Sequence, residues 1–193
     1  GSSSATATGL CEGTYTATVT DAAGCVTSCT PVVPSGCFQI QGILVDACGL
    51  GTEEGLNEMV FLQVGSSPLP TSGLTVTWAT ANTWQGLCTN PTFIANVNAT
   101  ITGGGSLIAA PATLPAGANV VLITSATTLS STNLFTNLTG PLYVLFQCGS
   151  QTSGNFTNSS GSPGLKTLTM TFNGSCTDQV SYLPGSLTTN VDT

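Results

Sequence analysis

Residues 165–172 read Leu-Lys-Thr-Leu-Thr-Met-Thr-Phe, and this stretch indicates the fold class clearly. Its residues alternate, with Leu168, Met170 and Phe172 on one side and three threonines on the other. A period of two is typical of a half-buried β-strand, because successive side chains of a strand point to opposite faces of the sheet. We therefore predict a strand whose apolar face covers a core.

Other short stretches show the same alternation or a brief apolar run, with turn-forming residues between them. No stretch has sustained helical periodicity, and we expect one short helix at Ser131–Leu138. The pattern predicts an all-β fold, an antiparallel β-sandwich stapled by disulfides. The expected strands are Thr14–Thr20, Phe38–Ala47, Asn57–Val64, Gly73–Thr80, Ser106–Ala109, Ala118–Ser125, Pro141–Gln147 (buried on both faces), Leu165–Phe172 and Gln179–Leu183.

Charge is scarce in this chain and almost all of it is negative. Only 5% of the residues are charged, against about 25% in an ordinary domain, and Lys166 is the one cation. A single cation cannot neutralise a run of phosphates, so we exclude nucleic-acid binding and docking on anionic lipid. Without histidine, His-dependent catalysis and His-ligated metals are excluded as well. No apolar run approaches the ~20 residues that cross a bilayer, so we expect no membrane insertion.

Cysteine usage indicates an oxidising compartment. The count is even, and only Cys25 and Cys29 approach the spacing of zinc ligands, so we favour disulfides over zinc. We expect the first four cysteines to pair among themselves and the last four to link distant strands. Disulfides persist in secreted and cell-surface proteins, which predicts an extracellular location. The eight residues are Cys11, Cys25, Cys29, Cys37, Cys48, Cys88, Cys148 and Cys176.

Five Asn-x-Ser/Thr triplets are candidate sites of N-glycosylation. One or two are expected by chance in a chain so rich in these residues, and they matter only where a glycosylation system exists. Attached sugar would supply solubility that the scarce charge does not. The triplets begin at Asn98, Asn137, Asn155, Asn158 and Asn173.

Two prolines within Thr30–Gly36 indicate a linker. We therefore assign residues 1–30 to an N-terminal β-hairpin segment, 31–36 to the linker and 37–193 to the β-sandwich domain. Residues 9–25 read GLCEGTYTATVTDAAGC. This stretch resembles the end of the repeat found in gliding-motility adhesins (SprB-type repeats). The first half of that repeat is missing here, so the resemblance implies a partial repeat whose strand pairs elsewhere, as a possible donor strand.

Several motifs after residue 37 resemble a module of surface proteins exported by the type-nine secretion route, whose layout is similar to the lamin-tail-like immunoglobulin sandwich. The resemblance implies an immunoglobulin-like sandwich within a long, secreted, multi-domain protein, and it implies a fold more than an activity. We also expect both ends of the chain to be cuts through a longer polypeptide or processing points. The motifs are ILVDACG (43–49), EGLNEMV (54–60), WQGLC (84–88), LPAG (114–117), LITS (122–125) and LYVLF (142–146).

An acidic cluster is the one candidate metal site. It has three interpretations: a Ca²⁺ site built of oxygen ligands, a paired-carboxylate glycosidase site, or a solvated turn between two strands in which Glu58 fixes an edge. The spacing does not match a calcium-binding loop, so we favour the solvated turn, then Ca²⁺, and expect no other cofactor. The cluster consists of Asp46, Glu53, Glu54, Asn57 and Glu58.

Four aromatic residues, Trp78, Trp84, Tyr143 and Tyr182, are candidates for a sugar-stacking face. Trp78 alternates with Leu74 and Val76, so we expect it in the core. Trp84 lies in the loop 82–88 and is the candidate sugar contact.

The sequence thus predicts a non-enzymatic structural subunit of an extracellular fibre or of a long cell-surface adhesin. Few charges protect its sheet edges, so strand addition between copies or between tandem modules is the expected mode of assembly. The first alternative is a carbohydrate-binding module of a secreted protein, with surface glycans as partners. A secreted hydrolase that uses the acidic cluster is the second alternative.

Overall fold

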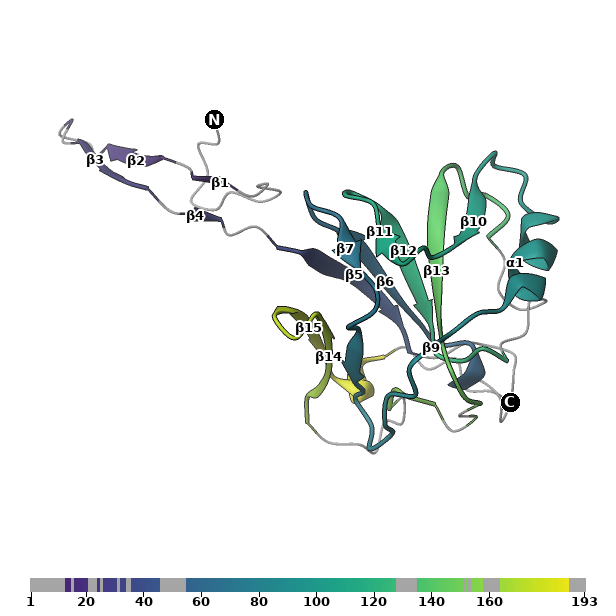
Figure 1. The fold of residues 1–193 in the computed structure, drawn as a ribbon. Coiled ribbons are helices and arrows are strands. Elements are labelled where there is room, and N and C mark those ends of the chain that lie inside the picture. Colours follow the sequence, from purple (N-terminus) through teal and green to yellow (C-terminus); the bar gives the residue numbers. More distant parts are fainter. Residues whose placement is uncertain are drawn as a thin grey trace. The chain divides into compact units, whose positions relative to one another are not determined.

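A computed structural model describes residues 13–14, 16–20, 24, 26–30, 32–33, 36–45, 55–127, 135–150, 152, 154–157 and 164–187. The chain divides into two compact units, Gly1–Gly36 and Cys37–Thr193. Figure 1 labels most elements of both units. None of the helices in the described ranges is long and apolar enough to cross a membrane.

The first unit contains two antiparallel strand pairs. β1 (Gly13–Thr14) pairs with β4 (Val32–Val33), and β2 (Ala17–Thr20) pairs with β3 (Val26–Cys29). Of the predicted strand Thr14–Thr20, Thr14 lies in β1 and Ala17–Thr20 form β2, so the single continuous strand is wrong. Every residue of β2 and β3 is exposed, so this hairpin buries none of its side chains.

The second unit is built around a six-stranded sheet in the order β10-β13-β12-β6-β5, with β9 also on β13. β13 runs parallel to both β10 and β12, so the predicted antiparallel pairing is wrong for these two pairs. The connection 124–140 is long enough for the crossover that parallel neighbours need. The strands are β5 (Phe38–Leu44), β6 (Met59–Val64), β9 (Leu87–Cys88), β10 (Ser106–Ala109), β12 (Asn119–Ile123) and β13 (Pro141–Gln147).

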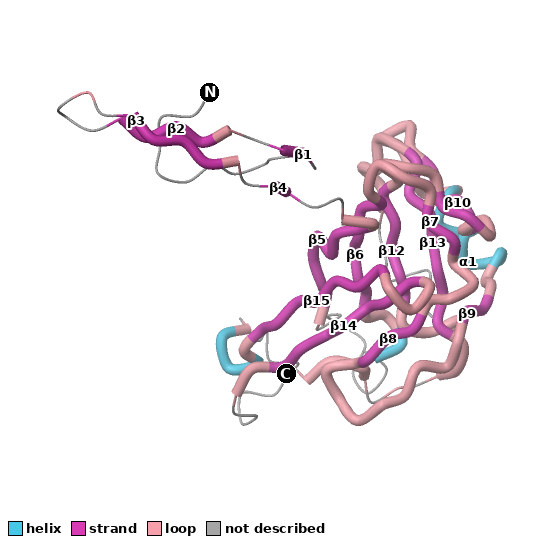
Figure 2. The backbone as a smooth tube through the Cα atoms, turned by 60° about the vertical axis from the view of Figure 1, so that its left-hand side comes forward, coloured by secondary structure: helices cyan, strands magenta, loops and turns pink. Residues whose placement is uncertain are grey.

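A three-stranded antiparallel sheet packs on one face of the larger sheet. It consists of β15 (Cys176–Tyr182), β14 (Lys166–Phe172) and β8 (Thr75–Thr77), in that order, and Figure 2 shows the three strands side by side. Leu168, Met170 and Phe172 are fully buried between the sheets, as the alternation of residues 165–172 predicts. The all-β sandwich is thereby confirmed, and its immunoglobulin-like subtype stays a prediction.

One helix covers the other face of the larger sheet. In α1 (Pro91–Asn98) the side chain of Asn90 caps the helix by accepting from the Phe93 N–H, and Pro91 occupies the first turn. Phe93 and Val97 join a second core cluster on this face. The strand β13 has apolar side chains in both clusters, as predicted. The helix expected at Ser131–Leu138 is wrong in its described part, 135–138, which forms a turn.

The remaining short elements complete the second unit. β7 (Leu69–Pro70) pairs antiparallel with β11 (Thr113–Leu114). A single 3₁₀ turn, Pro184–Ser186, follows β15.

Two disulfides brace the second unit, Cys37–Cys176 and Cys88–Cys148. The expectation that the first four cysteines pair among themselves is wrong for Cys37, because strand packing places it beside β15 although β15 is remote in sequence. The Cys88–Cys148 bond links β9 to the end of β13, two strands that are distant in sequence, as expected, and neighbours in the sheet. Since disulfides persist only where thiols are not kept reduced, both bonds indicate an oxidising environment.

Candidate functional site

Glu58, at the start of β6, is a buried anchor and not part of a solvated turn. The side chain is 1% exposed and that of Asn57 is completely buried, so the predicted solvated turn is wrong at these two residues. Oε2 of Glu58 accepts from the N–H of Asn155 at 2.6 Å, and Oε1 accepts from the N–H of Phe156 at 3.3 Å. The carboxylate therefore holds residues 154–157 against β6, through hydrogen bonds that a charged acceptor strengthens.

The structure leaves the proposed Ca²⁺ site as a prediction. Asp46, Glu53 and Glu54 lie outside the described residues. The described part of the chain contains no group of three or more Cys, Asp and Glu side chains placed to hold a metal ion. Glu58 already directs both carboxylate oxygens at backbone N–H groups, which is the geometry of a structural anchor.

Aromatic rings fix residues 154–157 from the other side. The ring of Phe156 lies 5.7 Å from that of Trp78 and 6.1 Å from that of Tyr182, edge to face in both cases. The hydroxyl of Tyr182 accepts from the Thr157 N–H at 2.9 Å and donates to the Thr157 carbonyl at 3.1 Å. Burial raises the pKa of Tyr182, the hydrogen bond from Thr157 lowers it, and the charge of Glu58 raises it.

Trp78 belongs to the core, as the sequence predicts. It is 3% exposed, and its Nε1 donates to Oε1 of Gln147 at 2.9 Å. Nε2 of Gln147 donates in turn to the Thr124 carbonyl at 3.0 Å, which satisfies this buried amide. Trp78 is therefore not available for stacking against a sugar. The ring centre of Trp84 lies 6.3 Å from that of Trp78, and this half-buried residue remains the candidate tryptophan for a sugar contact.

The five glycosylation candidates differ sharply in access. Asn137 and Asn173 are exposed, whereas Asn155 is completely buried, so a glycan cannot be attached to it in the folded protein. Both polar atoms of the Asn98 amide bond to Leu107: Nδ2 donates to the Leu107 carbonyl and Oδ1 accepts from the Leu107 N–H. The fifth candidate, Asn158, lies outside the described residues.

Asn98 also protects an edge of the larger sheet. Its two hydrogen bonds, 3.0 and 2.7 Å long, imitate those of a neighbouring strand on the side of β10 that faces away from β13. Exposed sheet edges invite pairing with other chains. A side-chain amide therefore covers the position that an added strand would need.

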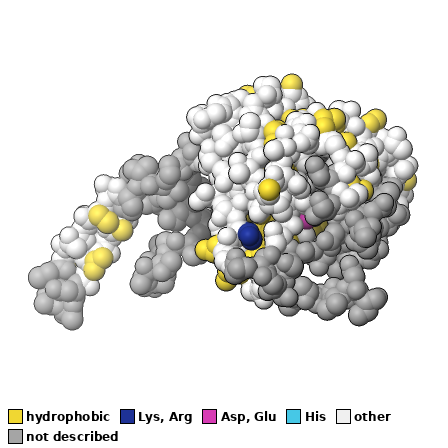
Figure 3. Space-filling view, turned by 90° about the horizontal axis from the view of Figure 1, so that it is seen from below, with side chains coloured by type: hydrophobic (Ala, Val, Ile, Leu, Met, Phe, Trp, Pro, Cys, Tyr) yellow, Lys and Arg dark blue, Asp and Glu magenta, His cyan; other side chains and the backbone are white. Residues whose placement is uncertain are grey.

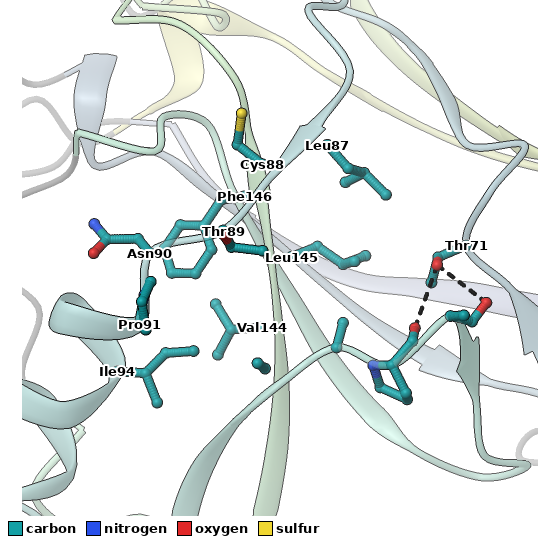
Figure 4. A pocket seen from close by; sticks show the side chains of 14 residues that line it. Thr71, Leu87, Cys88, Thr89, Asn90, Pro91, Ile94, Val144, Leu145 and Phe146 are labelled. Carbon is teal, nitrogen blue, oxygen red and sulfur yellow. Dashed lines mark hydrogen bonds between the residues drawn. The ribbon is translucent and has the colours of Figure 1, made fainter.

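The short strands β9 and β10 both pair with β13, and an apolar groove of about 440 Å³ lies beside β13 where Cys88 of β9 and Ala109 of β10 line it. The sequence analysis did not predict this groove. Figure 4 shows Ile94 of α1 and Val144 of β13 facing the same space. Two polar side chains of its lining are engaged elsewhere: Thr71 donates to the carbonyls of Pro111 and Ala112, and Asn90 caps α1. The lining consists of Thr71, Leu87, Cys88, Thr89, Asn90, Pro91, Ile94, Ala109, Ala110, Pro111, Ala112, Val144, Leu145 and Phe146.

The β2–β3 hairpin of the first unit is the second surface feature. Its register pairs Val19 with Thr27 and Thr20 with Val26, so the two valines lie on opposite faces of the hairpin. Val19 is 64% exposed and Val26 65%. Cys29, at the end of β3, is exposed and forms no disulfide, which corrects the expectation that it is cross-linked.

Comparisons with protein families, with curated proteins and with solved structures find no match to this chain.

Proposed function

We propose that this chain is a non-enzymatic structural module of an extracellular fibre or a long cell-surface adhesin. In this function the β2–β3 hairpin adds to the sheet of a neighbouring copy or a tandem module. The observation that carries the proposal is that all eight residues of β2 and β3 are exposed.

A two-stranded hairpin is only marginally stable by itself in water. β2 and β3 carry β-branched residues typical of buried strands, with Val19 and Val26 exposed on opposite faces. Each strand also has one outer backbone edge that its partner does not pair. Addition to another sheet satisfies these backbone groups and buries the valines.

The low charge of the chain supports the same mode of assembly. Proteins commonly protect exposed sheet edges with charged side chains, and the described residues of β2 and β3 carry none. The two disulfides of the second unit support a location outside the reducing cytosol. Carbohydrate binding has less support, because Trp78 is buried and Trp84, the candidate sugar contact, is itself half-buried.

Electron microscopy and light scattering of the purified protein test the proposal. We expect the full chain to form fibres and a chain lacking residues 1–36 to stay monomeric with an unchanged melting temperature. The double variant Val19→Lys/Val26→Lys should also stay monomeric, because it places charge on both hairpin faces. A matched control, Thr113→Lys at the exposed residue of β11, should polymerise normally. Identical fibres from the truncated and full chains would contradict the proposal, as would a full chain that never assembles.

A further inference from the structure

Side chains cover two outer edges of the larger sheet. On β10, the amide of Asn98 occupies both backbone groups of Leu107. On β5, at the opposite end of the strand order, the carboxylate of Asp178 accepts from the Ile40 N–H. An uncovered edge strand invites pairing with another chain, so both of these edges are poor places for a strand to add.

β9 is an outer strand whose edge stays open. The Gly86 carbonyl accepts from the Cys148 N–H at 2.9 Å, so the backbone of Gly86 faces β13. Backbone groups of alternate residues in an antiparallel pair point to opposite sides, and the N–H and C=O of Leu87 therefore point away from β13. No strand in the described part of the chain pairs with that side of β9, and Leu87 is 36% exposed.

The open edge is held in a fixed position. β9 has only two residues, and so short a strand forms few ladder hydrogen bonds of its own. The disulfide from Cys88 to Cys148 ties it to the residue that follows β13, with the two Cα atoms 4.9 Å apart. A strand that pairs with β9 therefore does not have to order it first, which lowers the cost of association.

The apolar groove lies directly beside this edge. Leu87 lines it together with Ile94, Ala109 and Val144, and none of the lining residues is charged. A volume of about 440 Å³ lies in the range of cavities that bury small ligands, so it can receive side chains from a strand laid along β9. A charged occupant would lose its hydration without gaining a partner. The groove therefore favours an uncharged, apolar occupant.

The β2–β3 hairpin has the composition of such an occupant. Its two strands read ATVT and VTSC, which are small or β-branched residues without charge. Val19 and Val26 lie on opposite faces and are 64% and 65% exposed, so either face that turns toward a groove presents a valine. On the side drawn in Figure 3, hydrophobic side chains lie on the described surface of the hairpin with no charged side chain beside them.

Charge also favours this contact between two copies. The chain has a formal net charge of −7, so copies repel each other wherever their acidic residues approach. The described residues of β2 and β3 and the lining of the groove carry no acid. A contact made only of these two surfaces keeps like charges out of the interface.

We propose that the β9 edge and the adjoining groove receive the β2–β3 hairpin of a neighbouring copy. A strand of the hairpin pairs with the backbone of Leu87, and one of its two valines enters the groove. This inference rests on the proposed assembly through the hairpin and adds the acceptor site. Each copy carries one hairpin and one groove, so the contact is head-to-tail and extends into an open fibre.

Complementation between two defective full-length variants tests the proposal. Ala109→Trp fills the groove and keeps the hairpin, because Ala109 is an exposed residue of the lining. Val19→Lys/Val26→Lys disables the hairpin and keeps the groove. We expect each variant alone to stay monomeric in light scattering. Their mixture should form 1:1 dimers in native mass spectrometry, because one intact hairpin meets one intact groove and no site is left for a third copy.

Two further variants control for the substitution and for folding. Thr113→Trp places the same ring on an exposed strand residue outside the groove and should form fibres as the wild type does. Leu87→Lys places a charge on the acceptor edge and should behave as Ala109→Trp does, alone and in the mixture. Melting temperatures equal to that of the wild type show that each variant is folded.

The outcomes separate this inference from the proposed function. Normal fibres from folded Ala109→Trp and Leu87→Lys would refute the groove as acceptor, and hairpin-dependent assembly would stand if Val19→Lys/Val26→Lys stays monomeric. A mixture that remains monomeric would refute the pairing of hairpin with groove. A wild-type chain that never assembles would overturn both proposals.

Discussion

The backbone N–H of Ile40 donates a 2.7 Å hydrogen bond to Oδ2 of Asp178, which lies 138 residues further along the chain. This bond joins β5 of the larger sheet to β15 of the smaller one. The disulfide Cys37–Cys176 connects the same two strands close by. One edge of the sandwich is therefore closed twice, by a covalent bond and by a hydrogen bond to a carboxylate.

Loss of the Asp178 carboxylate should destabilise the second unit. We expect Asp178→Ala to lower the free energy of unfolding by about 1–2 kcal/mol, because the half-buried Ile40 N–H loses a charged acceptor. Urea denaturation measures the change. Gln179→Ala, at the next and exposed position, serves as the control and should stay within about 0.5 kcal/mol of wild type. Equal stability of the two variants would contradict the role assigned to Asp178.

Gly55 should tolerate no side chain. A Cβ on Gly55 would lie 2.7 Å from the Thr152 carbonyl oxygen and closer still to the backbone of Gly154. We expect Gly55→Ala to cost about 2 kcal/mol or more, since two backbone segments must separate. Gly42 has open space around it and no positive φ, so Gly42→Ala should be neutral or slightly stabilising. Thermal unfolding of both variants checks the contrast, and a stable Gly55→Ala would refute the close approach.

Both disulfides should contribute to stability, and Cys37–Cys176 should contribute more. It closes a loop with a sequence separation of 139, against 60 for Cys88–Cys148. The chain-entropy relation gives about 5 and about 4 kcal/mol for loops of these lengths. Paired Cys→Ser variants, unfolded in urea without reductant, measure each contribution. The reverse order of stabilities would show that the entropy of the unfolded chain does not govern the difference.

Stability should fall in alkaline solution because of Tyr182. Burial raises the pKa of this phenol above its ordinary value of 10.0, so the folded protein favours the neutral form. This preference for the neutral phenol stabilises the folded state fully below pH 10.0. The stabilisation is lost as the pH rises toward the pKa of the folded state, because the phenol of the unfolded chain ionises first.

Tyr182→Phe isolates this effect. The variant should be about 1 kcal/mol less stable than wild type at neutral pH, because the hydrogen bonds with Thr157 are lost. Above pH 10.0 the difference in unfolding free energy between wild type and variant should narrow, because the wild type loses stability as Tyr182 ionises and the variant has no phenol to ionise. Urea denaturation across the alkaline range measures both curves, and a constant difference would contradict the raised pKa.

Local patterns along the chain predicted the strands well. The alternation of residues 165–172 identified β14 and its buried face, and the apolar run 141–147 identified a strand buried on both sides. The helix α1 was missed because it has only eight residues, too few for its period to stand out. Asn90 followed by Pro91 was its one local signal, as a capping residue before a proline in the first turn.

The sequence did not predict properties that depend on contacts between segments far apart in the chain. The parallel pairing of β13 with β10 and β12, and the partner of Cys37, depend on how strands meet in space. Glu58 was expected to fix the edge of a solvated turn, yet the N–H groups of Asn155 and Phe156 satisfy its carboxylate in the interior. The groove beside β13 arises from two strands that share one edge, which no local motif encodes.

The bond between Cys37 and Cys176 also determines how the second unit responds to pulling. Tension applied to the chain on the two sides of this bond passes through one covalent link and bypasses the polypeptide between the two cysteines. The core enclosed by that loop would stay folded under loads that stretch an unlinked domain. In single-molecule stretching, the enclosed residues should therefore add no contour length until a reductant cuts the bond.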